Sequence, residues 1–164
     1  YLDAEPNPAH KKLAQWEREG RLLAVITQNI DGLHQKAGSR EVLELHGSVL
    51  RNYCEKCGAF YGLDTILHST GVPRCPACGG DIKPDVVLYE ESLDQEVLAK
   101  AVHYIRQADL MIIGGTSLVV YPAAGLVQYF RGRHLVVANK GQVGSNVGAD
   151  LTINGPIGQV FSQL

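Results

Sequence analysis

The sequence predicts an α/β fold, in which a Rossmann-like parallel sheet carries helices on both faces and a small module is inserted into the domain. Short apolar runs alternate with helical segments along the chain, and this alternation is typical of parallel sheets covered by helices. All four cysteines are confined to one stretch of about thirty residues, which indicates the inserted module. Polar and glycine-containing loops follow the strands, where folds of this class bind their ligands.

The first predicted strand, at residues 22–26, is a continuous apolar run of the kind that is buried on both faces. Further strands are predicted at the largely apolar segments 85–89, 110–113, 134–138 and 151–153. The predicted helices occupy the segments between them, at residues 8–19, 95–107, 122–130 and 156–164. Asn7 followed by Pro8 is a typical helix start, and Asp94 is a candidate cap for the second helix.

Composition limits the classes of function. The chain has 164 residues, of which 45% are hydrophobic and 20% charged, as in globular proteins. The formal net charge is -2, so nothing electrostatic favours nucleic-acid or membrane-surface binding. No apolar run approaches the roughly 20 residues that a membrane span needs, and residues 1–20 are too polar for a signal peptide. We therefore expect a cytoplasmic protein with neither nucleic acid nor membrane among its partners.

The cysteines have the spacing of a zinc site. Cys54 pairs with Cys57 and Cys75 with Cys78 as two Cys-x-x-Cys motifs. Each motif can form a tight knuckle that offers two thiolates, and two knuckles give a tetrahedral set that suits one Zn²⁺ ion. Disulfides and a redox pair are the alternatives, but a disulfide framework needs a secreted context that nothing in the sequence indicates.

A site made of four thiolates leaves no ligand position for water or substrate, so the zinc is expected to be structural. Metal binding would supply folding free energy on the order of 10 kcal/mol to this loop-rich segment. We expect the zinc-ribbon module to span residues 48–84. The catalytic centre is expected in the Rossmann-like domain formed by residues 1–47 and 85–164.

Three loops that follow predicted strands carry side chains suited to ligand binding. Residues 27–34 read Thr-Gln-Asn-Ile-Asp-Gly-Leu-His, which suits a ribose or a carboxamide, although a polar turn is the alternative. Residues 114–117 read Gly-Gly-Thr-Ser, where the backbone could approach a phosphate closely, although a plain strand-to-helix turn is equally open. Asn139 could hydrogen-bond a ribose. The standard Gly-x-Gly-x-x-Gly fingerprint is absent from the sequence.

His46 stands in the string Leu-His-Gly, immediately before the cysteine segment. A neutral imidazole at this boundary is suited to take a proton from a hydroxyl near pH 7. The alternative is a histidine that only packs or is solvated. The other histidines lack a comparable context.

In their order along the chain, these motifs resemble the sirtuin family of NAD-dependent protein lysine deacylases, in its bacterial form. The resemblance covers residues 6–164. The strings that carry it are Thr-Gln-Asn-Ile-Asp-Gly-Leu-His at 27–34, Leu-His-Gly at 45–47, the two Cys-x-x-Cys motifs, Gly-Thr-Ser-Leu-x-Val-x-Pro at 115–122, and Asn139.

The resemblance implies a role for each matching residue. His46 is the general base. The residues implied to bind NAD⁺ are Gln28, Asn29 and Asp31 on the nicotinamide side, and Gly115, Thr116, Ser117, Asn139 and Ile157 on the adenosine side. The residues implied to pair with an acetylated peptide, by added-strand hydrogen bonding, are Val86, Val87, Leu88 and Tyr89.

The implied reaction consumes NAD⁺ as a co-substrate. The acyl-lysine carbonyl oxygen attacks C1′ of the nicotinamide ribose, and nicotinamide leaves. His46 then deprotonates a ribose hydroxyl, which attacks the resulting imidate to give free lysine and O-acetyl-ADP-ribose. The alternatives are ADP-ribosyl transfer to protein in the same pocket and a non-enzymatic zinc-ribbon binding module.

The sequence departs from the family pattern in two places. The family begins with a strand, a Gly-Ala-Gly-x-Ser loop that binds NAD and a Pro-Asp-Phe-Arg segment, all absent from this sequence, so we expect little or no deacylase activity from this chain by itself. Where the family has Phe-Gly-Glu after the substrate strand, this sequence has Tyr89-Glu90-Glu91. The missing glycine and the added charge are expected to alter peptide preference.

Overall fold

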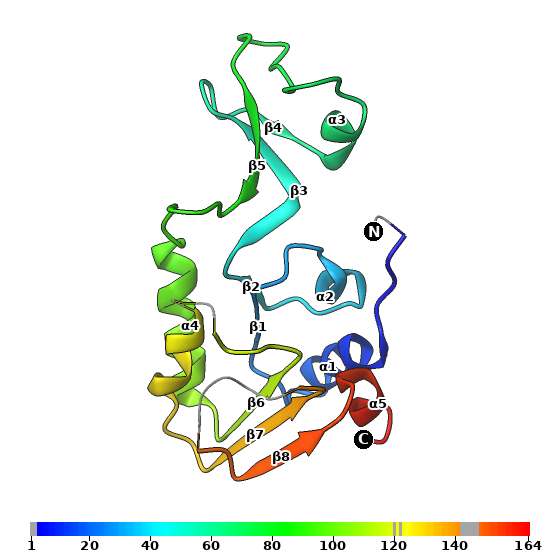
Figure 1. The fold of residues 1–164 in the computed structure, drawn as a ribbon, viewed down its shortest axis with the longest axis vertical. Helices are drawn as coiled ribbons and strands as arrows, with labels where there is room; N and C mark the ends of the chain where they lie inside the picture. Colours follow the sequence, from blue (N-terminus) through cyan, green and yellow to red (C-terminus); the bar gives the residue numbers. More distant parts are fainter. Residues whose placement is uncertain (1–2, 120, 122, 142–147) are drawn as a thin grey trace. The chain divides into compact units, whose positions relative to one another are not determined.

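The computed structural model describes residues 3–119, 121, 123–141 and 148–164 (Figure 1). The chain divides into two compact units, of which the first comprises residues 1–26, 33–43 and 94–164. The second unit comprises residues 27–32 and 44–93 and contains all four cysteines. It extends beyond the segment 48–84 that is predicted to form the zinc module.

Both long helices of the first unit begin where the sequence predicts. α1 (Pro8–Arg18) is capped by Asn7, whose side-chain oxygen accepts hydrogen bonds from two backbone N–H groups of the first turn. α4 (Gln95–Gln107) is capped by Asp94 in the same way. The caps supply partners for N–H groups that a helix start leaves unpaired. Among the described residues, no helix is long and apolar enough to cross a bilayer.

Three parallel strands form the sheet of the first unit, in the order β6–β7–β8 (Figure 1). They are Leu110–Gly114, His134–Asn139 and Leu151–Asn154, so these three predicted strands are confirmed to within one residue. The strand predicted at 22–26 is shorter and shifted: β1 covers Val25–Thr27 and pairs with β2 (Val42–Glu44), not with this sheet.

Helical segments cover both faces of the parallel sheet. Successive residues of a strand face opposite sides of its sheet. On one face of this sheet, a buried cluster packs against the 3-10 helix η1 (Ala123–Tyr129) and the residue that follows it. The cluster consists of Ile113, Leu135 and Val137. On the other face, Gly114 is so close to Ile157 of α5 (Ile157–Phe161) that a Cβ at this glycine would overlap the isoleucine side chain. The predicted two-sided arrangement is therefore confirmed.

A contact between two tilted aromatic rings joins α1 to α5 within the first unit. The ring centroids of Trp16 and Phe161 are 5.5 Å apart, and Phe161 is buried. The guanidinium of Arg21 lies over the Trp16 ring at 5.4 Å, which adds a cation–π contact. Trp16 is the only tryptophan of the chain.

The second unit is built on an antiparallel sheet with the order β4–β3–β5. β3 covers Gly47–Cys54, β4 Phe60–Tyr61 and β5 Ile82–Val86. The strand predicted at 85–89 was wrong in its bounds. Val86 is paired with Gly47, which is the first residue of β3. Residues 87–89 therefore have no residue of β3 opposite them, and they lie outside β5. Two short helices complete the described elements, α2 (Leu33–Lys36) in the first unit and α3 (Leu63–Leu67) in the second.

Gly47 is required where β3 meets β5. Its φ is +74°, and a Cβ would overlap the carbonyl oxygen of Asp85. We expect Gly47→Ala to lower the free energy of unfolding of the second unit by roughly 3 kcal/mol, because left-handed strain adds to a backbone clash. Urea unfolding followed by circular dichroism measures this. Gly71→Ala is the matched control, since Gly71 has a φ of +77° but no atom within 4 Å; equal losses in both variants would rule out the clash.

Candidate functional site

His46 lies in the turn between β2 and β3 and is half-buried. Its Nδ1 is 3.1 Å from the carbonyl oxygen of Gln28. Because a carbonyl oxygen can only accept a hydrogen bond, Nδ1 carries the proton and the neutral ring has its lone pair on Nε2. The contact thus selects one tautomer and leaves Nε2 as the basic atom.

The loop after β1 lies against the turn that contains His46. Its backbone is held at Thr27, whose carbonyl accepts from the N–H of Leu45 at 2.9 Å, and at Ile30, whose carbonyl accepts from the N–H of Val49 at 3.1 Å. The residues predicted to line the nicotinamide side all lie on this loop; they are Gln28, Asn29 and Asp31. The structure therefore brings these three residues and the predicted base together in one unit.

The predicted peptide-binding segment also lies beside His46. The N–H of Val87 donates to the His46 carbonyl at 3.1 Å. In the described sheet β5 is paired only with β3. At the start of β5 the N–H of Ile82 donates to the Pro73 carbonyl at 2.9 Å, so an added strand can pair only with the later part of its other edge. Only Val86 of the predicted set belongs to β5; Leu88 and Tyr89 are exposed and lie beyond its end.

Arg51 bridges the two segments that flank this site. Its Nη1 donates to Glu44 and its Nε to Asp85, each at 2.8 Å. The side chain of Glu44 is only 6% exposed, so the bridge compensates a nearly buried carboxylate. Burial acts to lower the pKa of Arg51, but the hydrogen bonds that Arg51 donates to the Glu44 and Asp85 carboxylates outweigh it and raise that pKa. Sequence reasoning missed Arg51, because one arginine in a strand carries no signal of its partners.

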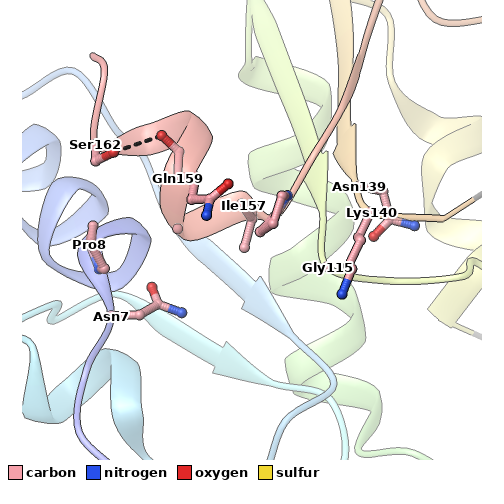
Figure 2. Close-up of a pocket in the computed structure, with 10 residues that line it drawn as sticks. Asn7, Pro8, Gly115, Asn139, Lys140, Ile157, Gln159 and Ser162 are labelled. Atoms are coloured by element: carbon pink, nitrogen blue, oxygen red, sulfur yellow. Dashed lines mark hydrogen bonds between the residues drawn. The ribbon is translucent and has the colours of Figure 1, made fainter.

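A cavity of about 530 Å³ lies in the first unit (Figure 2). Its volume is in the range of small-molecule sites. The lining residues come from the start of α1, the ends of β6 and β7, and α5 with its flanks; they are Asn7, Pro8, Gly115, Asn139, Lys140, Pro156, Ile157, Gly158, Gln159 and Ser162. Three residues predicted for the adenosine side, Gly115, Asn139 and Ile157, therefore share one cavity.

Asn139 is held with its acceptor atom available. Its Nδ2 donates to the carbonyl oxygens of Thr116 and Gly141, both at 3.0 Å. Both amide hydrogens are then used, so Oδ1 is the atom that remains for a ligand hydroxyl. Thr116 supports the cavity through this bond, whereas Thr116 and Ser117 are not among its lining residues. Val120 and Pro122 of the predicted motif lie outside the described residues.

Several lining residues were missed by sequence reasoning. Lys140 directly follows Asn139 at the carboxyl end of β7, a position where this class of fold places ligand contacts, so its position could have revealed it. Asn7 and Pro8 were read only as a helix start. Gln159 and Ser162 gave no signal, because the packing of α5 brings them to the cavity.

The four cysteines form one cluster. All their Sγ atoms lie within 4.8 Å of one another, with Cys54 and Cys78 at 3.4 Å and Cys57 and Cys75 at 3.7 Å. A tetrahedral site with Zn–S bonds of about 2.3 Å has sulfur atoms about 3.8 Å apart. The donor set and its spacing therefore fit one Zn²⁺ ion, and four thiolates would close its coordination shell.

Tyr61 supports the cysteine cluster from outside. Its hydroxyl is 3.0 Å from Cys75 Sγ. The hydrogen bond lowers the pKa of Cys75 to about 6 and raises the pKa of Tyr61 to about 12. Because zinc binds the thiolate form, this hydroxyl favours the state of Cys75 that a metal needs. Nothing in the sequence around Tyr61 predicts this role.

We expect Tyr61→Phe to weaken zinc retention about 10-fold, the lower end of the usual effect of such supporting contacts. The ring stays in place while the hydrogen bond to Cys75 is lost. Competition with a chromogenic chelator at pH 7 measures this. Tyr53→Phe is the control, because Tyr53 belongs to the same unit but its ring contacts Phe60; wild-type zinc affinity in Tyr61→Phe would contradict the assignment.

The chain as a whole is similar to known proteins. A family model described as Sir2 family matches residues 1–122. The chain is 58% identical over 165 residues to an NAD-dependent protein deacetylase of Clostridium perfringens (strain 13 / Type A), covering 100% of this chain and 68% of the relative. It is 53% identical over 162 residues to an NAD-dependent protein deacetylase of Clostridium acetobutylicum, covering 98% and 66%. The chain thus spans about two thirds of the length of these curated relatives.

Solved structures resemble the chain closely. A structure of Sir2 with a p53 peptide and NAD⁺ gives a TM-score of 0.91 at 43% identity, covering 99% of this chain and 70% of that one. A structure of Sir2 bound to an acetylated peptide gives a TM-score of 0.91 at 42% identity, covering 99% and 70%.

Proposed function

Because the chain belongs to the Sir2 family, we propose that its function is the NAD⁺-dependent removal of acetyl groups from protein lysines, with nicotinamide and O-acetyl-ADP-ribose as products. The relatives are deacetylases, and similar structures hold an acetylated peptide and NAD⁺. The observation in the chain that carries the proposal is the placement of His46, with Nδ1 on the Gln28 carbonyl and the Val87 backbone beside it.

We assign the general base to Nε2 of His46. NAD⁺ supplies the ADP-ribose group that accepts the acetyl group. Nε2 takes the proton from a ribose hydroxyl, which makes that oxygen nucleophilic. The Gln28 carbonyl keeps its hydrogen bond to Nδ1–H throughout, so it stabilises the imidazolium that forms and prevents the ring from turning.

The open edge of β5 and the residues after it are assigned to the peptide. Backbone pairing with Val86 and Val87 would hold the peptide extended beside His46. Leu88 and Tyr89 complete the assigned segment.

The NAD⁺ contacts are assigned to two groups of residues. Gln28, Asn29 and Asp31 take the nicotinamide side, where the amides and the carboxylate offer hydrogen bonds to the carboxamide and the ribose. Asn139 Oδ1 accepts from the adenosine ribose. The remaining adenosine contacts are assigned to Gly115, Thr116, Ser117 and Ile157.

Domain roles and location complete the proposal. Residues 48–84 are assigned to the zinc module, and residues 1–47 and 85–164 to NAD⁺ binding. The zinc is structural, because Cys54, Cys57, Cys75 and Cys78 would occupy all four of its positions. A cytoplasmic location is supported by the cysteines being free thiols gathered in one cluster.

The test uses the gene product that contains this chain, an acetyl-lysine peptide and NAD⁺ labelled in the adenosine half. We expect O-acetyl-ADP-ribose, nicotinamide and deacetylated peptide to appear in equal amounts. Label retained on protein would show ADP-ribosyl transfer instead and would overturn the proposal.

A further inference from the structure

Glu90 has an unusual backbone conformation at the end of the assigned peptide segment. Its φ is +71°, one of only two positive values among the described non-glycine residues. A side chain is disfavoured there because its Cβ crowds the backbone. Within the described residues Glu90 makes no hydrogen bond or ion pair, so no contact of its side chain accounts for the conformation. A strained residue next to the edge assigned to the peptide is a candidate for a functional role.

The side chain of the neighbouring Glu91 stabilises the turn at residues 88–91, but it does not neutralise the charge of Glu90. Its Oε2 accepts from the N–H of Leu88 at 2.9 Å and from Lys83 Nζ at 3.1 Å. Lys83 also donates to the Val86 carbonyl at 3.1 Å. The hydrogen bond from Leu88, and then that from Lys83, lower the pKa of Glu91. Glu91 is therefore a compensated carboxylate that shapes the turn, whereas the exposed carboxylate of Glu90 is uncompensated.

The side chains just before Glu90 are exposed and apolar. Leu88 is 55% exposed and Tyr89 is fully exposed. Together with Glu90 they form a short rim, residues 88–90, that follows the open edge of β5. Backbone pairing along such an edge is indifferent to peptide sequence, so selectivity must come from side chains like these.

We propose that the rim 88–90 selects acetylated peptides that carry lysine or arginine within two residues of the acetyl-lysine, with Glu90 as the charge that recognises them. The inference rests on the proposed function and names its substrate class. The uncompensated carboxylate attracts the cationic end of the peptide side chain. The stem of a lysine or arginine packs on the Tyr89 ring, which would otherwise stay in water.

The test compares acetyl-lysine peptides that differ at one flanking position, which is lysine, glutamine or glutamate, scanned over the two residues on each side. At the best position we expect the gene product that contains this chain to favour lysine over glutamine about threefold to fivefold in kcat/KM, as for an exposed ion pair. The preference should shrink as salt is added. The affinity for each peptide is also measured by calorimetry. This shows the preference for lysine over glutamine even if turnover is too slow to compare.

Three variants separate charge from backbone strain. Glu90→Gln keeps a side chain at the positive φ and should abolish the preference for lysine over glutamine. Glu90→Lys should reverse it in favour of the glutamate peptide. Glu90→Gly removes both strain and charge and should also lose the preference. Glu55→Gln, an exposed carboxylate of the same unit, is the control and should keep it.

The outcomes are distinguishable. If no acetylated peptide is bound or turned over, the proposed function and the inference both fail. If peptides are turned over but all flanks give equal kcat/KM, or the preference survives Glu90→Gln, the inference alone is overturned.

Discussion

Replacing His46 with glutamine is expected to lower kcat for deacetylation by at least about 10²-fold, because glutamine cannot take the proton from the ribose hydroxyl. Its amide can still donate to the Gln28 carbonyl, to which His46 Nδ1 lies at 3.1 Å, so the loop should stay in place. The base acts after nicotinamide has left, and exchange of labelled nicotinamide into NAD⁺ should therefore persist in the variant. The two rates are measured on the same preparation.

His68→Gln is the matched control for this variant. The ring of His68 also makes a backbone contact, at 2.8 Å between Nδ1 and the Asp64 carbonyl, in the same unit. It lies in the zinc-module segment and has no place in the proposed chemistry. Wild-type deacetylation in His46→Gln, or equal losses in both variants, would contradict the assignment of the base.

Replacing Cys75 with serine is expected to remove the metal and with it the order of the second unit. A structural zinc site contributes folding free energy on the order of 10 kcal/mol, and few buried apolar side chains surround the cysteines. We expect metal analysis to fall from one zinc per chain to almost none. Hydrogen exchange should become fast in β3 and β5, while α1 and α4 stay protected.

Ser69→Ala is the control for this loss. It removes a 2.7 Å hydrogen bond to the Ile66 carbonyl in the same unit but leaves the thiolates untouched, so zinc should be retained. A strong chelator added to the wild-type protein should reproduce the exchange pattern of Cys75→Ser. Slow exchange in β3 after the metal has been removed would contradict a structural role for the ion.

The elements that the sequence predicts well are those whose causes are local. The cap at Asp94 and the apolar run of β7 are each specified by a few adjacent residues, and the structure has them within one residue of the expected bounds. The cysteine cluster was also predictable, because two short motifs with a suitable spacing are enough to bring four thiolates together.

The features that the sequence did not predict depend on contacts between distant residues. The largely apolar segment 85–89 predicts a strand, but the pairing of Val86 with Gly47 decides where β5 ends. The hydrogen bond from Tyr61 to Cys75 depends on how β4 docks beside the knuckles. Likewise, the packing of Ile157 on Gly114 determines which α5 residues reach the cavity.

Because of the position of Trp16, unfolding of the first unit can be followed by intrinsic tryptophan fluorescence. This indole contacts both Arg21 and Phe161, all within the first unit, so its emission reports the docking of α1 on α5. Stripping the metal from the cysteines should leave the emission spectrum unchanged, whereas melting of the first unit should shift it to the red. One intrinsic optical signal thus distinguishes the melting of one unit from that of the other, without any added dye.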